Sequence, residues 1–241
     1  MFSDKKVTAV ISVYNEEKTV GNVVSAILDC KIVDEIIVVN DGSTDNTAKI
    51  LKGLLQENKF EYVEFGRNRG KSYAMTEGVE LSKGDIIVFI DADIIGFECK
   101  HIKQLLLPLV RGEADMIIGQ PCPDRYRKKL NLLKPLELLA GERAVYKKDI
   151  LPLVERGRTS KYGAETLGIL YYKSQNKRMK IEYLWGVTHL IKSQKEQFPH
   201  SLKSYSKESA QIFTTITTNY FLVFDVVRNS ISKFITEITE R

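Results

Sequence analysis

Short apolar runs alternate with stretches of helical periodicity over the first half of the chain. Runs rich in β-branched residues predict strands at Val7–Val13, Glu35–Asn40, Glu61–Phe65, Ile86–Asp91 and Ala114–Ile118. Between them, apolar residues at helical spacing predict helices at Glu16–Cys30, Ser43–Leu55 and Gly70–Ser82. Continuous apolar strands separated by helices are typical of a parallel sheet covered on both faces. We therefore expect an α/β fold.

This alternation is lost after Pro121. The elements expected beyond it are strands at Glu142–Tyr146 and Ile181–His189, helices at Lys147–Val154 and Ala164–Lys173, a polar loop at Lys192–Lys207, and a long helix at Glu208–Thr239. No repeat or linker is evident. We therefore expect one domain over residues 1–207, whose two halves meet near residue 120, and a C-terminal helical extension over residues 208–241.

The composition is that of a globular protein with a sizeable core. Of 241 residues, 43% are hydrophobic, yet no run approaches the roughly 18 apolar residues of a transmembrane helix. The first residues do not follow the pattern of a signal peptide. Cys30, Cys99 and Cys122 fit no zinc or disulfide spacing, so we expect reduced cysteines in a cytoplasmic protein.

Positive charge is concentrated in the middle of the chain. Residues 121–207 hold 19 Lys and Arg against 8 Asp and Glu, whereas residues 1–120 hold 14 against 19. A basic segment indicates an anionic partner, either a phosphorylated or carboxylated acceptor or an anionic membrane surface, although a merely solvated surface would look the same. No motif for nucleic-acid binding is present, so we do not expect a nucleic-acid partner.

Two carboxylates end the strand predicted at Ile86–Asp91. Because side chains two apart on a strand point the same way, Asp91 and Asp93 are expected to face one point at the edge of the sheet. Two such carboxylates repel each other unless a cation lies between them, and Mg²⁺ or Mn²⁺ accepts oxygen ligands together with substrate phosphates. The spacing favours a metal–diphosphate site, although a solvated turn would show the same pattern.

Two other strand ends carry candidate binding residues. Asp41 follows a predicted strand, where its carboxylate can accept a hydrogen bond from a base N–H or can cap the turn. Lys71 follows Gly70, but Phe65 stands where a P-loop requires glycine, so Lys71 is either a point charge for a diphosphate or an exposed helix start. The missing Gly-x-Gly-x-x-Gly argues against a dinucleotide reductase, and the missing nucleophile elbow argues against a hydrolase of that type.

Taken together, these segments resemble family 2 glycosyltransferases with the GT-A fold. The resemblance covers about residues 5–120, with Ser12 standing where the family often has proline, and its segments in chain order are Tyr14-Asn15-Glu16-Glu17, Asp41-Gly42-Ser43-Thr44-Asp45, Asn68-Arg69-Gly70-Lys71 and Asp91-Ala92-Asp93. It implies a single Rossmann-like, mostly parallel sheet flanked by helices. It also implies a nucleotide-binding half over about residues 1–120 and an acceptor half over about residues 121–207.

The resemblance further implies roles for individual residues. Asp41 would read the base, Lys71 would approach the diphosphate or ribose, Asp91 would contact the ribose or the metal, and Asp93 would bind the metal. The full set of expected nucleotide contacts is Val13, Tyr14, Asn15, Glu16, Asp41, Lys71, Asp91 and Ala92.

The second half is similar to the glucosyl-3-phosphoglycerate synthase group. The similarity rests on Leu139-Ala140-Gly141-Glu142, on Tyr162-Gly163-Ala164-Glu165 and on the later His189. It implies that Glu165 contacts the donor sugar or the acceptor and that His189 joins Asp91 and Asp93 at the metal. The expected acceptor contacts are Arg125, Arg127, Gly141 and Arg143. The chain is shorter than that group's members and lacks their Gly-Gly-Arg segment.

The resemblance implies a Mg²⁺- or Mn²⁺-dependent hexosyltransferase whose catalytic residues are Glu165, Asp93 and Lys71. The donor would be a UDP-sugar or, less favoured, a GDP-sugar, and the acceptor a hydroxyl or phosphate of a small anion such as a phosphoglycerate. A polyprenyl-phosphate sugar synthase at the membrane surface and a catalytically silent nucleotide-sugar binder stay open as alternatives; a nucleotidyltransferase is less favoured because its Gly-rich first loop is missing. The aromatic segment Tyr220–Phe224 would serve core packing, a homodimer or peripheral contact with the inner face of a membrane.

Overall fold

Alternate residues of the first strand pack on opposite faces of a central sheet. In β1 (Val7–Val13), Ala9 and Ile11 belong to the hydrophobic core of one face, whereas Val10 belongs to the core of the other. This period of two follows from the pleat of a strand, and both faces must be covered because both carry apolar side chains. The structure is a computed structural model, and it describes residues 5–123, 140–159, 163–190 and 214–239.

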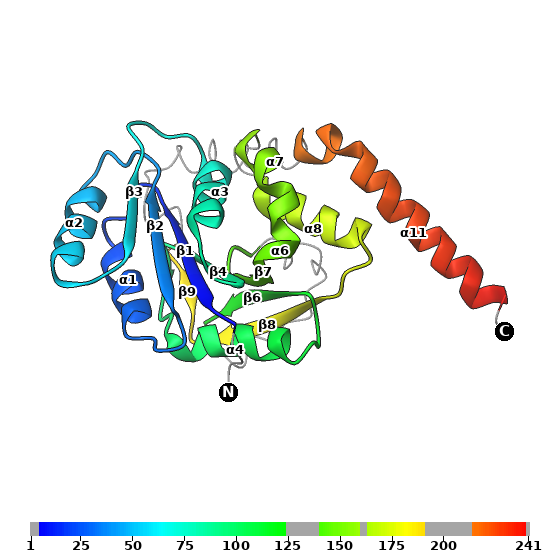
Figure 1. Ribbon diagram of the computed structural model, residues 1–241, viewed down its shortest axis with the longest axis horizontal. Coiled ribbons are helices and arrows are strands. Elements are labelled where there is room, and N and C mark those ends of the chain that lie inside the picture. Colours follow the sequence, from blue (N-terminus) through cyan, green and yellow to red (C-terminus); the bar gives the residue numbers. More distant parts are fainter. Residues whose placement is uncertain (1–4, 124–139, 160–162, 191–213, 240–241) are drawn as a thin grey trace.

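Seven strands form this sheet, in the order β3-β2-β1-β4-β7-β6-β8 (Figure 1). Besides β1, they are β2 (Glu35–Asn40), β3 (Glu61–Glu64), β4 (Ile86–Asp91), β6 (Met116–Cys122), β7 (Arg143–Tyr146) and β8 (Met179–Trp185). The first four strands pair in parallel, and β8 is parallel to β6. Strand β7 is antiparallel to both β4 and β6. The predicted mostly parallel sheet is confirmed, with one antiparallel strand, β7, inserted between β4 and β6.

Helices cover both faces of the sheet (Figure 1). The core of one face receives side chains from α1 (Val20–Leu28), α2 (Thr47–Glu57) and α4 (Cys99–Val110). The core of the other receives side chains from α3 (Lys71–Leu81), α6 (Lys147–Ile150), α7 (Val154–Thr159) and α8 (Ala164–Ser174). A short 3₁₀ segment, Leu151–Leu153, joins α6 to α7.

The strand expected at Ile181–His189 is two strands instead. Strand β8 ends at Trp185, and β9 (Thr188–His189) pairs with β5 (Ile94–Ile95) in a separate two-stranded sheet. The extended strand is interrupted by a turn at Gly186, whose φ of 82° is unfavourable for residues other than glycine. The expectation of one continuous strand was therefore wrong, and the turn carries His189 back toward the end of β4.

The expectation of three reduced cysteines was also wrong. Cys30, just after α1, and Cys99, the first residue of α4, form a disulfide across 69 residues of sequence. Cys122 takes no part in this disulfide. Sequence spacing gave no sign of this bond because it depends on two helices that pack on the same face of the sheet.

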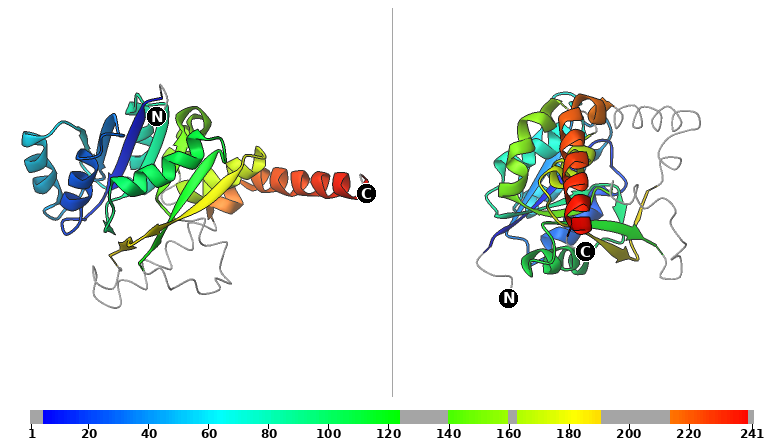
Figure 2. Two further views of the ribbon diagram at one scale, coloured as in Figure 1. Left: turned by 90° about the horizontal axis from the view of Figure 1, so that it is seen from below. Right: turned by 90° about the vertical axis from the view of Figure 1, so that its right-hand side faces the viewer.

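The last helix, α11 (Tyr220–Thr239), extends away from the sheet (Figure 2). Near its start, Leu222 is buried against Leu153 and Leu167, and further along the Asn229 side chain donates to the carbonyl of Ser174 at 2.9 Å. The other side of the helix exposes the apolar side chains of Tyr220, Phe224, Val227 and Ile231. The polar loop expected at 192–207 lies outside the described residues.

Candidate active site

The carboxyl ends of β1, β2 and β4 lie side by side at one edge of the sheet. Register places Ser12 of β1 opposite both Val39 of β2 and Asp91 of β4. The segments that follow these strands therefore meet at this edge, which is where ligands bind in open α/β sheets.

The loop after β1 is held by the loop after β2. Asn15, at a φ of 56°, donates its N–H to the Ser43 hydroxyl at 3.0 Å and accepts from the Thr44 N–H at 2.8 Å. The Glu16 N–H donates to the Thr47 hydroxyl at 2.9 Å. These bonds fix the predicted nucleoside-binding segment, in which Tyr14 is 42% exposed and its ring is free to meet a ligand. Val13 and Ala92 are buried, so any ligand contact they make uses backbone atoms.

Asp41 ties the end of β2 to the turn before α3. Its two carboxylate oxygens accept the N–H groups of Arg69 at 2.7 Å and Gly70 at 2.8 Å. Burial raises the pKa of this carboxyl, against the lowering effect of these hydrogen bonds and of the Arg69 charge. The side chain is 2% exposed, which favours a role in holding the Lys71 turn. Direct reading of a base by Asp41 stays a prediction.

Lys71 lies between two carboxylates from distant parts of the chain. Its Nζ is 2.7 Å from Asp91 Oδ1 and 2.8 Å from Glu165 Oε1. Burial opposes the charge on Lys71, but Asp91 and Glu165 outweigh that effect and raise its pKa well above the usual value. Burial would raise the pKa of Glu165, but the charges of Lys71 and Arg143 lower it. Lys71 and Glu165 are therefore both charged at neutral pH.

The start of α8 is what brings Glu165 to Lys71. The Ala164 N–H donates to the hydroxyl of Ser72 in α3 at 3.0 Å, and Glu165 follows in the first turn of α8. A carboxylate is favourable there because the helix dipole is positive at its N-terminus. Sequence reasoning did not identify Ser72, since a buried serine in a helix carries no motif.

The pairing of β5 with β9 brings His189 next to Asp93. His189 Nδ1 lies 3.0 Å from Asp93 Oδ1, and His189 Nε2 lies 3.7 Å from Glu142 Oε2. Burial opposes charge on the imidazole, but the hydrogen bond to Asp93 and the charges of Glu142 and Asp91 raise its pKa to about 9. The sequence predicted that His189 and the strand-end aspartates come together, and the structure places them together.

Glu142 is a site residue that sequence reasoning gave no role of its own. Its side chain is fully buried, and neither carboxylate oxygen accepts a hydrogen bond from the described residues. Burial and the nearby charge of Asp91 raise its pKa to about 8, while His189 acts in the opposite direction. One oxygen of Glu142, one of Asp91 and a nitrogen of His189 lie within 4.8 Å of one another. The only signal in the sequence was the Leu139–Glu142 segment.

Gly141 and Arg143 flank Glu142 and were expected to contact an acceptor. A Cβ on Gly141 would lie 2.1 Å from Asp91 Oδ2, so only glycine leaves room for that carboxylate. Arg143 is 3% exposed and donates to the carbonyls of Ala140 at 2.9 Å and Glu165 at 3.1 Å. Its burial favours support of the site, and contact with an acceptor stays a prediction. Arg125 and Arg127 lie outside the described residues.

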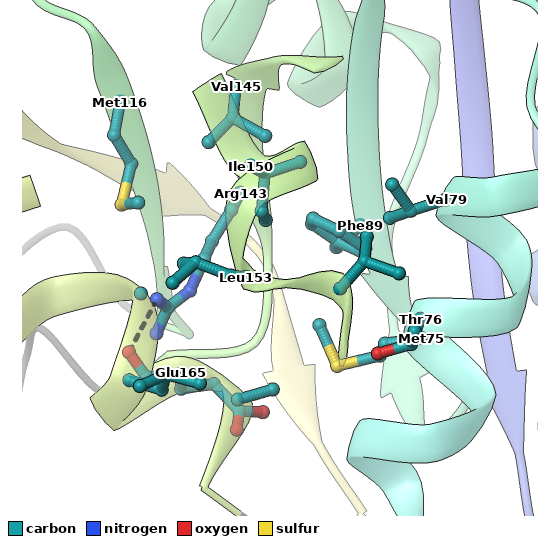
Figure 3. A pocket seen from close by; sticks show the side chains of 14 residues that line it. Met75, Thr76, Val79, Phe89, Met116, Arg143, Val145, Ile150, Leu153 and Glu165 are labelled. Carbon is teal, nitrogen blue, oxygen red and sulfur yellow. Dashed lines mark hydrogen bonds between the residues drawn. The ribbon is translucent and has the colours of Figure 1, made fainter. Parts of the chain in front are cut away.

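A small apolar cavity lies behind the charged groups. It measures about 40 Å³, and Figure 3 shows Arg143 and Glu165 close together at one side while Phe89, Val79 and Met75 stand at the other. A nucleotide needs several hundred Å³, so this cavity belongs to the packing beneath Glu165 and is not the donor site.

The side chains at the end of β4 fit a divalent cation. Carboxylate oxygens and an imidazole nitrogen suit Mn²⁺, and carboxylates suit Mg²⁺. A buried carboxylate without a hydrogen-bond partner, such as that of Glu142, calls for a compensating positive group.

No helix within the described parts of the chain combines the length and apolar character that a membrane crossing would require.

Comparison with curated proteins finds polysaccharide synthases among the relatives of this chain. The chain is 37% identical over 149 residues to poly-beta-1,6-N-acetyl-D-glucosamine synthase of Staphylococcus aureus (strain COL), covering 56% of this chain and 36% of that protein. It is 34% identical over 90 residues to the synthase of the same name from Staphylococcus epidermidis, covering 37% and 22%. The alignments span about a third or less of these relatives' length.

Comparison with solved structures finds the same fold. Glucosyl-3-phosphoglycerate synthase from Mycobacterium tuberculosis, in complex with Mn²⁺, uridine diphosphate and phosphoglyceric acid, has a TM-score of 0.67 at 23% identity. That alignment covers 89% of this chain and 78% of the other. The complex of that enzyme with Mg²⁺ and uridine diphosphate gives a TM-score of 0.68 at 23% identity, covering 89% and 79%. The likeness confirms the expected GT-A fold.

The family is shown by sequence over most of the sheet. Residues 8–154 match the family described as glycosyl transferase family 2, which is more than half of the chain. This stretch includes the segments after β1, β2 and β4, together with α3 and its Lys71. The chain therefore belongs to glycosyl transferase family 2 and is a glycosyltransferase.

Proposed function

We propose that this protein transfers a hexose from a nucleoside-diphosphate sugar to a small anionic acceptor with the help of Mg²⁺ or Mn²⁺. A UDP-sugar is the favoured donor, a GDP-sugar is second, and the accepting group is a hydroxyl or a phosphate. The observation that carries the proposal is the convergence of Lys71, Asp91, Glu165 and His189, from four separate elements, at the carboxyl edge of the sheet.

The proposed cation site is the end of β4. Asp91, Asp93 and His189 are its candidate ligands, as the sequence predicts, and their side chains gather there. A divalent ion at this place would neutralise charge that develops on the departing diphosphate and would orient the donor.

Lys71 and Glu165 are proposed to act on either side of the reacting bond. Lys71 Nζ is held 2.7 Å from Asp91, so a diphosphate at the end of β4 comes within its reach. The Glu165 carboxylate is ionised and ion-paired, which suits an acceptor of hydrogen bonds from sugar hydroxyls. If the reaction inverts the anomeric centre, Glu165 must take the acceptor proton; if it retains it, the leaving phosphate can do so.

Two alternatives stay open. The exposed apolar side chains of Tyr220, Phe224, Val227 and Ile231 on the far side of α11 favour a polyprenyl-phosphate sugar synthase that works at a membrane surface, or a homodimer through this helix. A cytoplasmic location stays a prediction. A silent nucleotide-sugar binder would keep the same binding residues without transfer, but the ion-paired Glu165 beside Lys71 argues for chemistry.

The test measures binding and transfer separately. Calorimetry with UDP-glucose, UDP-N-acetylglucosamine and GDP-mannose, each with and without Mn²⁺, identifies the donor. UDP-N-acetylglucosamine is included because the curated relatives are named as poly-beta-1,6-N-acetyl-D-glucosamine synthases. Transfer of radiolabelled sugar is then measured onto 3-phosphoglycerate, glycerate and polyprenyl phosphate in vesicles. Metal-dependent donor binding with transfer to a small anion supports the proposal. Transfer only to the lipid favours the first alternative, and binding without any transfer favours the second.

A further inference from the structure

Glu142 is an unusual group for the interior of a protein. Its side chain has no solvent exposure, and neither oxygen accepts a hydrogen bond from the described residues. A buried carboxylate without a hydrogen-bond donor destabilises the folded state, because it loses its hydration and gains no hydrogen bond from the protein in exchange. The sheet nevertheless holds this residue firmly, since the Glu142 carbonyl accepts the Gly119 N–H at 2.8 Å and β7 begins at the next residue.

The groups that face Glu142 are themselves potential ligands. His189 Nε2 is 3.7 Å from Glu142 Oε2, and an oxygen of Asp91 completes a set whose atoms lie within 4.8 Å of one another. Ligand atoms of one Mg²⁺ or Mn²⁺ ion lie about 3–4.5 Å apart, because each sits roughly 2.1–2.2 Å from the ion. The separation between His189 and Glu142 is too long for a hydrogen bond and suits two ligands of one ion.

Neighbouring residues hold the three groups in this arrangement. Asp93 Oδ1 lies 3.0 Å from His189 Nδ1, which leaves Nε2 directed at Glu142; a carboxylate on the other ring nitrogen is the usual support of a metal-binding histidine. Gly141 lets the Asp91 carboxylate lie against the backbone next to Glu142, in space that any other side chain would fill.

We infer that Glu142 is a ligand of the divalent cation, together with Asp91 and His189 Nε2, while Asp93 orients His189 through Nδ1. The inference rests on the proposed metal dependence and puts Glu142, from the segment before β7, in the ligand position proposed above for Asp93. Donor binding is thereby linked to the second half of the chain, because the ion cannot be held fully until the residues around Glu142 are in place.

The test compares Glu142→Gln with the wild type and with Glu35→Gln. Glu35 is a control carboxylate at the opposite edge of the sheet, where its Oε2 accepts from the Thr8 hydroxyl at 2.7 Å. Mn²⁺ binding is measured on tag-free protein with saturating UDP, by calorimetry and by the electron paramagnetic resonance signal of free Mn²⁺. We expect the Kd for Mn²⁺ to rise at least about tenfold in Glu142→Gln and to stay within about twofold in the control.

A second readout separates ligation from a structural role. If Glu142 binds the ion, Glu142→Gln removes a buried carboxyl group that has no hydrogen-bond partner among the described residues, so the melting temperature without metal stays equal or rises while the stabilisation by Mn²⁺ is lost. If Glu142 only supports His189, the metal-free protein melts at a lower temperature and Mn²⁺ binds as before, and the inference is overturned.

A measurement on the wild type covers the case in which the variant does not fold. Anomalous diffraction from a crystal soaked in Mn²⁺ and UDP locates the ion, and a Glu142 oxygen in its coordination sphere confirms the inference. An ion bound by Asp91, Asp93 and His189 without Glu142 overturns the inference but leaves the proposed function intact. A wild-type protein that binds no Mn²⁺ even with UDP overturns both.

Discussion

Replacing Gly141 by alanine tests whether the position of Asp91 matters for donor binding. A Cβ at residue 141 would lie 2.1 Å from Asp91 Oδ2 and 2.5 Å from Oδ1. Non-bonded heavy atoms need about 3.5 Å, so the carboxylate must retreat by more than about 1 Å. That displacement breaks the 2.7 Å contact with Lys71. Crowding of this kind costs about 1–3 kcal/mol of folding free energy.

The functional effect of Gly141→Ala should exceed its effect on stability. Gly141 has no left-handed φ, so the added methyl group acts through the clash alone. We expect the Kd for UDP in Mn²⁺ to rise at least about tenfold, as when a ligand is misplaced, while the protein stays folded. Calorimetry measures the affinity, and urea denaturation measures the stability.

A second glycine-to-alanine substitution controls for the general effect of adding a methyl group to a glycine. Gly53 lies in α2 with nothing within 4 Å of an added Cβ, so Gly53→Ala should raise stability by about 0.5–1 kcal/mol and leave UDP affinity unchanged. Wild-type affinity for UDP in Gly141→Ala would show that Asp91 takes no part in donor binding, and the proposed site would then be wrong.

Three further outcomes are expected. Lys71→Met leaves the Asp91 and Glu165 carboxylates without their shared cation, so transfer should fall about 100-fold, whereas Lys52→Met, at a surface pair with Glu64, should keep wild-type rates. In the metal-free folded protein the pKa is about 9 at His189 and about 8 at Glu142, above the ordinary 6.5 and 4.5, so the folded protein holds protons that the unfolded chain releases. The urea concentration at the midpoint of unfolding should therefore fall as pH rises toward 9. A midpoint that does not change with pH would contradict those shifts. Reducing the Cys30–Cys99 bond, which closes 69 residues, should lower the free energy of unfolding by about 4 kcal/mol in urea titrations with and without reductant, and equal titrations would contradict the bond.

The parallel half of the fold was predictable because its strands are buried on both faces. Val7–Val13, Glu35–Asn40 and Ile86–Asp91 have the predicted bounds, since a continuous β-branched run leaves little choice. The helix expected from Ser43 begins instead at Thr47. Ser43 accepts a hydrogen bond from the Asn15 N–H, and such a contact between distant loops is invisible to local periodicity.

The functional side chains were predictable where they end a strand or belong to a recognisable segment. Lys71, Asp91 and Glu165 come together as the resemblance implied, with His189 beside Asp93. The two-residue strands β5 and β9 are too short to show a period, and they determine where His189 lies. A prediction from sequence could name the imidazole but not the partner of each ring nitrogen.

Glu142 was missed because its chemistry comes from topology. In sequence it is one acidic residue among several, about 50 positions from Asp91. Strand β7 runs antiparallel between β4 and β6, so the residues before it arrive at the same edge of the sheet where β4 ends. Had β7 been parallel to β4, its start would lie at the opposite edge and Glu142 would face no ligand. The single antiparallel strand therefore joins the second half of the chain to the first half at one cluster of charges. The specificity of this enzyme therefore depends on this cluster of charges, because changes on either side of it move the same carboxylates.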